Sequence, residues 1–123
     1  MKVIGFNHFT IEVRDVKHSV VFYIDILGLS EMNRPNFDFE GAWISMGGNQ
    51  SIHLVQNQLM NEVAGGSRKL HFAFEVEDIY GFKDYLVSQG IVIIKDIKAR
   101  PDGVLQLFVR DPDGYFIELT QIV

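Results

Sequence analysis

The chain has no cysteine among its 123 residues. This absence excludes disulfide bonds, thiolate metal ligands and a cysteine nucleophile, so any metal must be held by histidine and carboxylate side chains. The sequence also has no apolar run near the roughly 20 residues that a membrane-spanning helix needs. Because Met1–Gly5 leads directly into a strand pattern rather than a signal peptide, we expect a cytoplasmic protein with no membrane partner.

Positive charge is also scarce. The chain has 11 Lys and Arg residues against 16 Asp and Glu residues, and its net charge is −5. The basic residues are interpreted as scattered rather than clustered, which argues against binding to nucleic acid and favours a small-molecule partner. With 47% hydrophobic and 22% charged residues, the composition is ordinary for a globular protein, and a single domain over 1–123 is expected.

The sequence does contain an internal repeat. The stretch His8-Phe-Thr-Ile-Glu-Val-Arg-Asp15 returns 63 residues later as His71-Phe-Ala-Phe-Glu-Val-Glu-Asp78, with five of the eight positions identical. A second pair of similar stretches closes the two halves and aligns His53 with Glu118. The pattern indicates a tandem duplication of one module.

Each module is predicted to contain a strand, then a helix, then three strands. In the repeated stretch, apolar and polar residues alternate, so one face should meet the helix while the face with the histidine lines a wet space. Asp15 and Asp78 are placed to cap the two helices, and Gly28 and Gly90 to end them. Further strands are predicted at about 29–34, 41–46, 51–55, 91–98, 104–110 and 115–122. The predicted boundaries are module one at about 1–57, a linker at about 58–69, and module two at about 70–123.

The repeat also predicts a metal site. His8 and His71 open the first strand of each module, whereas His53 and Glu118 stand on the last strand. If first and last strands are neighbours, all four side chains point into one concave space. Three imidazoles and one carboxylate suit a borderline divalent metal better than Mg or Ca. For any one of them alone, a structural role is the alternative, such as an ion pair of Glu118 with Arg110.

Other side chains are secondary candidates. Glu12 and Glu75 are equivalent in the repeat and share the polar strand face, so they are candidates for acid–base work, with salt bridges as the alternative. His18 lies outside the repeat and is expected to be exposed. The predicted substrate-binding residues, each with a place in the apolar core as the alternative, are Trp43, Phe37 and Phe108.

With these motifs the sequence resembles the vicinal oxygen chelate superfamily, which includes glyoxalase I, bleomycin-resistance proteins, fosfomycin-resistance proteins and extradiol dioxygenases. The resemblance covers nearly the whole chain. It rests on the doubled His-x-x-x-x-Val-x-Asp motif, the Phe22-Tyr23…Leu27-Gly28 helix end, and Asp111-Pro-Asp-Gly-Tyr-Phe-Ile-Glu118-Leu. It implies an α+β fold in which two tandem βαβββ modules form a partly closed eight-stranded mixed sheet or barrel with helices outside. It also implies a homodimer.

The resemblance further implies that His8, His71 and Glu118 are metal ligands and that His53 takes the fourth position. Glyoxalase I normally carries a glutamate there as ligand and base, so His53 departs from that pattern. The implied cofactor is a divalent metal ion, with Zn, Ni, Fe(II), Co and Mn as candidates. Fosfomycin-resistance proteins use three ligands and a basic phosphonate pocket, of which this chain shows little. Extradiol dioxygenases usually carry four modules, and this chain has two.

The leading hypothesis is a metal-dependent enzyme of the glyoxalase type, a lyase or isomerase. Its small substrate would chelate the metal through two neighbouring oxygens, and the metal would stabilise enolate-like charge as a Lewis acid. Glu118 or His53 would carry the proton. One alternative is a metal-free binding protein of the bleomycin-resistance type for an aromatic or cationic compound. Another is a small relative of the dioxygenases or of the fosfomycin-type transferases.

Overall fold

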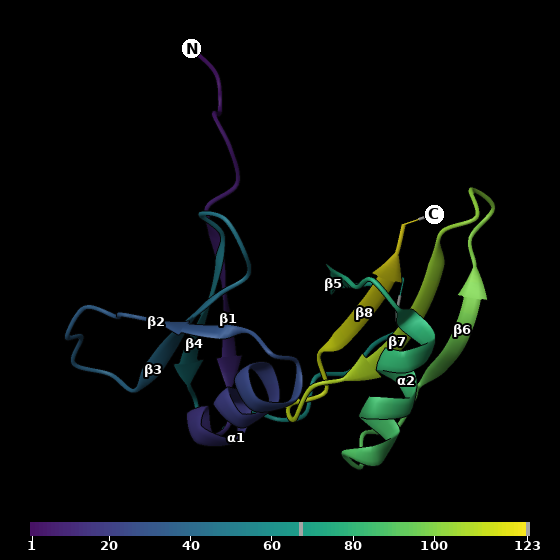
Figure 1. Ribbon diagram of the computed structural model, residues 1–123. Helices are drawn as coiled ribbons and strands as arrows, with labels where there is room; N and C mark the ends of the chain where they lie inside the picture. The colour runs from purple at the N-terminus through teal and green to yellow at the C-terminus, as the bar shows by residue number, and fades with distance from the viewer. Residues whose placement is uncertain (67, 123) are drawn as a thin grey trace. The chain divides into compact units, whose positions relative to one another are not determined.

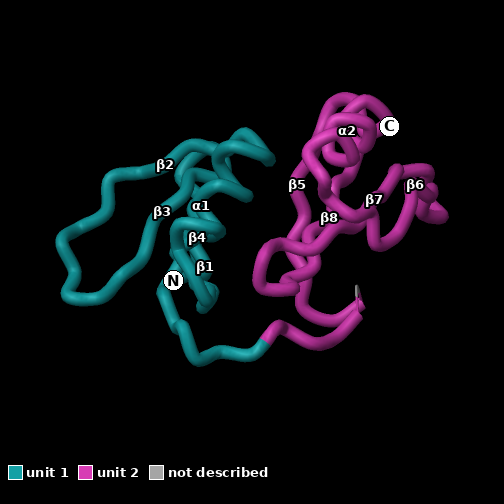
Figure 2. Tube along the Cα trace, turned by 90° about the horizontal axis from the view of Figure 1, so that it is seen from below, with its two compact units in different colours: residues 1–61 teal, residues 62–123 magenta. Residues whose placement is uncertain are grey.

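The protein is described by a computed structural model that covers residues 1–66 and 68–122 and forms two compact units, Met1–Asn61 and Glu62–Val123 (Figure 2). The elements of unit one are β1 (His8–Val13), α1 (Val16–Val20), the π-helix η1 (Val21–Ile26), β2 (Ser30–Met32), β3 (Gly41–Ser45) and β4 (Ser51–Gln56). Those of unit two are β5 (His71–Glu75), α2 (Ile79–Ser88), β6 (Lys95–Ala99), β7 (Leu105–Arg110) and β8 (Phe116–Gln121). This order confirms the predicted α+β fold of two tandem βαβββ modules (Figure 1).

The first and last strands of each unit are neighbours in a four-stranded mixed sheet. The strand orders are β1-β4-β3-β2 and β5-β8-β7-β6, and only the β1–β4 and β5–β8 pairs are parallel within the described residues. His8 lies opposite Ser51, and His71 lies opposite Phe116, so residues equivalent in the repeat hold equivalent register positions. The eight strands are divided between these two sheets, and the described residues form no closed barrel.

One face of each sheet is apolar and packs against the helix of its unit. In β1 the side chains of Ile11 and Val13 are buried, whereas those at 8, 10 and 12 are exposed, which confirms the predicted alternation. In unit two, α2 buries Ile79 and Leu86 and contacts β7 and β8. The other fully buried side chains of the two sheets include Ile44, Ile52, Leu54, Leu107, Val109, Ile117 and Leu119.

Both helices begin and end where the sequence predicts. The Asp15 carboxylate accepts a hydrogen bond from the Lys17 amide at 2.9 Å, and the Asp78 carboxylate accepts one from the Gly81 amide at 3.0 Å. Gly28 has φ +83° and Gly90 has φ +78°, values that favour glycine after a helix. In the described part of the chain, every helix is too short or too polar to span a membrane.

The first helix differs from the regular helix that its spacing predicts. After Val20 it widens into the π-helix η1, in which the Leu27 amide donates to the Phe22 carbonyl five residues earlier at 2.9 Å. Phe22 and Tyr23 are both buried, at 3% and 0% exposure, and their rings meet edge to face at 5.0 Å. Two consecutive aromatic residues of the π-helix are therefore buried in unit one.

Some strand boundaries also differ from the prediction. β6 begins at Lys95 rather than at about 91, because the Ile91 amide donates instead to the Leu86 carbonyl and closes the end of α2. The register of β6 on β7 then shifts between Lys95 and Lys98. β2 is shorter than predicted, at Ser30–Met32.

Two residues of the predicted linker are fixed to unit two. The Val63 amide donates to the Asp113 carbonyl at 2.8 Å. The Arg110 guanidinium donates to the Glu62 carboxylate at 3.2 Å. Arg110 therefore pairs with Glu62. Among the described residues it forms no ion pair with Glu118, although such a pair was the alternative role considered for Glu118.

Candidate functional site

The two candidate ligands of unit one stand side by side on β1 and β4. The imidazole rings of His8 and His53 stack with centroids 4.0 Å apart and an interplanar angle of 13°. This contact follows from the parallel register, in which His53 lies opposite Thr10, two residues beyond His8. The Nε2 atom of His53 lies 3.1 Å from the Ser51 hydroxyl. This contact, which was not predicted from the sequence, helps to hold the imidazole in place.

The two candidate ligands of unit two form an equivalent pair on β5 and β8. The Nε2 atom of His71 lies 3.2 Å from a carboxylate oxygen of Glu118. Glu118 is buried, with 4% exposure, and the Nδ1 atom of His71 lies 3.2 Å from the Lys69 carbonyl. Because burial without a partner is costly for a carboxylate, the His71 contact helps to stabilise Glu118 in this position.

An aromatic residue on the next strand flanks each pair. Trp43 lies opposite His53 in register, and the two rings stack at 4.0 Å with an angle of 5°. Phe108 lies opposite Glu118, and its ring meets that of His71 edge to face at 5.7 Å. Trp43 is half-buried and Phe108 is buried. Both therefore border the candidate ligands.

The third predicted substrate-binding residue, Phe37, is 44% exposed in the segment between β2 and β3. Its ring stacks on that of Phe39 at 5.2 Å and lies 6.1 Å from the ring of Trp43. The guanidinium of Arg34 lies 4.9 Å and 4.8 Å from the centroids of the Phe37 and Phe39 rings. Phe37 is thus part of an exposed aromatic group rather than of the core.

The environment of His53 favours its neutral form. Burial is the main cause that lowers the pKa of His53 below 6.5, and the nearby His8 and Arg34 lower it further. A neutral imidazole is the form that binds a metal ion, because a proton and a metal compete for the same nitrogen. The neutral form of the His53 imidazole is therefore favoured at neutral pH.

The remaining sequence candidates lie apart from these pairs. The Glu12 carboxylate accepts a hydrogen bond from the Asn57 side chain at 2.8 Å, and Glu75 is exposed. His18 lies on α1 with 78% of its side chain exposed and its Nδ1 atom 3.8 Å from the Asp15 carboxylate, as its position outside the repeat predicted.

A pocket of about 620 Å³ opens on the polar face of the unit-two sheet. It is lined by His71, Glu118 and Phe108, together with four basic residues, Arg68, Lys95, Lys98 and Arg100. The interpretation of the basic residues as scattered is wrong for these four. Lys95, Lys98 and Arg100 lie on or just after β6, and Arg68 comes from the segment before β5, so the sheet brings the fourth residue to the other three.

The donor chemistry of the two pairs fits a divalent transition metal. The four candidates are imidazole nitrogens and a carboxylate oxygen, which are ligands that Zn and similar ions accept. They lie as one pair in each compact unit. In residues 1–66 and 68–122 the structure does not gather three or more His, Asp or Glu side chains around one point.

Comparisons with known proteins give consistent matches along the chain. A family model described as Glyoxalase/Bleomycin resistance protein/Dioxygenase superfamily matches residues 5–119. A protein of Synechocystis sp. named "Probable lactoylglutathione lyase" is 34% identical over 121 residues, covering 93% of this chain and 92% of that protein. "Glyoxylase I 4" of Arabidopsis thaliana is 32% identical, covering 92% and 68%. A crystal structure described as that of a "putative glyoxalase family protein from Bacillus anthracis" has a TM-score of 0.82 at 31% identity, and the match covers 100% of this chain and 98% of that one.

Proposed function

The chain belongs to the Glyoxalase/Bleomycin resistance protein/Dioxygenase superfamily, and from this premise we propose that it is a metal-dependent lyase or isomerase of the glyoxalase type. Relatives named "Probable lactoylglutathione lyase", at 34% and 30% identity over 93% of the chain, support a glyoxalase-like enzyme. The observation that carries the proposal is the equivalence of the two side-chain pairs. Each pair lies on the strands that come first and last in the sequence of its unit, β1 with β4 and β5 with β8. The two pairs hold equivalent positions in the strand register.

The proposed ligands are His8, His53, His71 and Glu118. The candidate ions are divalent Zn, Ni, Fe(II), Co and Mn, which suit a mixed set of imidazoles and one carboxylate. When bound, such an ion supplies Lewis-acid stabilisation of negative charge on substrate oxygens. Stacking of the two rings in unit one and the contact of His71 with Glu118 hold the donor atoms of each pair close together.

Two of these residues are also proposed to move a proton. The Glu118 carboxylate is buried, and its contact with the His71 imidazole orients one of its oxygens. The His53 imidazole has a lowered pKa, so it is neutral near pH 7 and able to accept a proton. Either group can take a proton from a carbon next to a carbonyl and return it to a neighbouring atom.

The proposed substrate is a small molecule with two neighbouring oxygens. Trp43 and Phe108 flank the ligand pairs, and Phe37 lies close to Trp43, so these three rings are proposed to form the apolar wall of the substrate site.

A homodimer in the cytoplasm is proposed for the assembly and location.

Metal analysis tests the proposed ligand set. Untagged protein and the variants His8→Ala, His53→Ala, His71→Ala and Glu118→Gln are loaded with each candidate ion, desalted, and analysed for metal content. We expect about one ion per chain in the wild type and a marked loss in each variant. The matched control is His18→Ala, which removes an exposed imidazole outside the pairs and should keep the wild-type content. Equal metal content in wild type, control and ligand variants would end the proposal.

A substrate screen tests the reaction. The metal-loaded protein is offered adducts of methylglyoxal with thiols, then epoxides with a thiol, and then catechols with oxygen. We expect isomerisation of a methylglyoxal–thiol adduct that stops on chelation and returns on adding the metal. Turnover of only an epoxide or a catechol would instead assign the chain to transferase or dioxygenase chemistry.

A metal-free binding protein of the bleomycin-resistance type is the second candidate. The observation in its favour is the ring stack of unit one, where His53 lies between His8 and Trp43 at 4.0 Å from each. Such stacked rings, with the exposed Phe37 nearby, are suited to a flat aromatic ligand. Binding of an aromatic cation with the same affinity before and after chelation would favour this candidate.

A further inference from the structure

The two histidines that open β1 and β5 make a similar contact through the same ring nitrogen. In unit one, Nδ1 of His8 lies 2.7 Å from the side-chain oxygen Oδ1 of Asn7. In unit two, Nδ1 of His71 lies 3.2 Å from the backbone carbonyl oxygen of Lys69. Because an amide or carbonyl oxygen only accepts hydrogen bonds, Nδ1 is the donor in both contacts and carries the hydrogen. In the neutral imidazole, the free lone pair then lies on Nε2.

The two units build this contact from unlike residues. The repeat offset of 63 residues aligns Asn7 with Leu70, whose side chain has no acceptor and is 72% exposed. In unit two, the backbone carbonyl of Lys69 therefore supplies the oxygen that the Asn7 side chain supplies in unit one. The same arrangement, reached by a side chain in one copy and by the backbone in the other, points to a requirement of the histidine itself.

The backbone of Asn7 is held by the neighbouring strand. Its carbonyl accepts a hydrogen bond from the Ser51 amide at 3.1 Å, one residue before the β1–β4 register begins at His8. The Ser51 hydroxyl in turn lies 3.1 Å from Nε2 of His53, and the His53 ring stacks on that of His8. These contacts form a closed cycle through the four residues, so the Asn7 side chain starts from a fixed backbone.

The His8 ring is thereby restrained on one face and at one edge. The His53 ring covers the face, with an angle of 13° between the two planes, and the Asn7 oxygen meets the edge at Nδ1. Turning the His8 ring over would bring its carbon Cδ2 to the Asn7 oxygen in place of Nδ1, and the hydrogen bond would be lost. Asn7 therefore restrains both the orientation of the ring and the position of its hydrogen.

We propose that Asn7 is a positioning residue for His8: its side-chain oxygen holds the hydrogen on Nδ1 and leaves Nε2 as the nitrogen that can bind an ion. A metal-binding histidine ordinarily donates its other ring N–H to such an oxygen, and loss of this partner lowers metal affinity about 10–100-fold. The role of Nε2 towards an ion rests on the proposed function. The position of the hydrogen in the metal-free protein does not.

Imidazole NMR of the metal-free protein tests the position of the hydrogen. Metal is removed on a chelating resin, and long-range proton–nitrogen spectra of protein labelled with ¹⁵N-histidine are recorded at about pH 9, where an ordinary histidine side chain is neutral. We expect His8 to carry its hydrogen mainly on Nδ1. A neutral histidine without an acceptor carries it mainly on Nε2, so Asn7→Leu, which copies unit two, should shift the ratio of the two forms towards Nε2 about fivefold.

Two further variants separate this role from a general effect on structure. Asn7→Asp keeps an oxygen that accepts and cannot donate, so it should restore the hydrogen to Nδ1. The control Asn61→Leu removes an exposed amide side chain outside the cycle and should leave His8 as in the wild type. The Ser51 amide should exchange its hydrogen at the wild-type rate in Asn7→Leu, because the backbone carbonyl at position 7 remains. The proposal is overturned if wild-type His8 carries its hydrogen on Nε2, or if Asn7→Leu matches the control.

Calorimetric titration with the ion that the wild type retains tests the role towards the metal. We expect Asn7→Leu to lower the affinity about tenfold, at the lower end of the general range because the contact is exposed, and Asn7→Asp to recover it. Unchanged affinity in Asn7→Leu would overturn the positioning role. A wild-type protein that holds no ion, yet has the His8 hydrogen on Nδ1, would contradict only the proposed function. A metal-loaded wild type whose metal-free form has that hydrogen on Nε2 would contradict only the role of Asn7.

Discussion

His53 is the residue at which chemistry and environment are most closely linked. Burial, His8 and Arg34 all lower its pKa, and the first of these is the largest cause. We predict that His8→Gln in the metal-free protein raises the pKa of His53 towards 6.5 without reaching it, because the burial remains. Titration of the imidazole carbon-bound protons by NMR measures this, and His18→Gln is the matched control. An unchanged midpoint in His8→Gln would contradict the predicted interaction.

The sign of this shift also sets a pH dependence. A group with a depressed pKa in the folded protein contributes stability that is fully present above its unfolded pKa, near 6.5, and is lost as the pH falls through the folded value. Protonation of His53 also competes with metal binding. We therefore predict that both the metal affinity and the urea midpoint of unfolding fall as the pH is lowered below about 6.5. In His53→Gln, the urea midpoint should depend less on pH over this range.

At the scale of elements, the β7–β8 turn is held by one buried side chain. The Asp111 carboxylate, 5% exposed, accepts the amides of Asp113 and Tyr115 at 2.9 Å each. We predict that Asp111→Ala lowers the free energy of unfolding by about 2 kcal/mol, because two buried donors lose their acceptor, and that Asp111→Asn, which keeps one acceptor oxygen, costs less. Urea denaturation measures this, with the exposed Asp38→Ala as control. A change in Asp111→Ala no larger than in the control would contradict the assigned role of the carboxylate.

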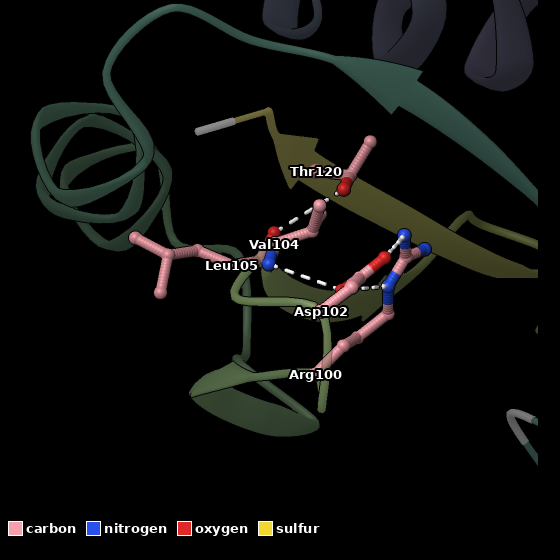
Figure 3. Close-up of polar contacts among 5 residues, drawn as sticks. All are labelled: Arg100, Asp102, Val104, Leu105 and Thr120. Atoms are coloured by element: carbon pink, nitrogen blue, oxygen red, sulfur yellow. Dashed lines mark hydrogen bonds and ion pairs between the residues drawn. The ribbon is translucent and has the colours of Figure 1, made fainter.

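The β6–β7 hairpin depends on an exposed carboxylate instead. The hydrogen bond from Arg100 (Figure 3) is the largest cause of the lowered pKa of Asp102, so the contact should persist below pH 3.8 and be lost as the pH falls further. We predict that Asp102→Asn speeds hydrogen exchange of the Val104 amide, its hydrogen-bond donor, while amides in the β8 strand exchange as before. Asp38→Asn is the control, and equal exchange of Val104 in both variants would show that the carboxylate does not hold the turn.

Elements were predictable from the sequence where their causes are local. Asp15 and Asp78 cap helices because each carboxylate reaches an amide within three residues, and the strand register follows from the repeat. The π-helix after Val20 was not predicted from the helical spacing, and it coincides with two consecutive buried aromatic residues, Phe22 and Tyr23. The late start of β6 was not predicted either, since the Ile91 amide is used by the end of α2.

At the scale of the whole molecule, the repeat made it possible to predict that His8 lies near His53 and His71 near Glu118. The two members of each pair are 45 or more positions apart in the sequence. Each pair meets because the first and last strands of a unit are parallel neighbours, which the duplicated order of elements indicates. The basic pocket had only a partial signal, because Lys95, Lys98 and Arg100 lie within six positions, on or just after one predicted strand. Arg68 precedes β5, and only the strand order β5-β8-β7-β6 makes it line the same pocket as Lys98 on β6.

The division of the four candidate ligands between two units leads to a prediction about the whole chain. Each of His8→Ala/His53→Ala and His71→Ala/Glu118→Gln leaves only two ligands, too few for tight binding, so we predict that both double variants lose metal affinity to a similar extent. Calorimetric titration with the ion that the wild type retains measures this, with His18→Ala as control. Near-normal affinity in either variant would show that the other pair does not bind the ion. The two double variants can also be mixed. If metal binding then returns, the metal site combines the intact pair of one chain with the intact pair of a second chain, so the site is built from two copies of the protein.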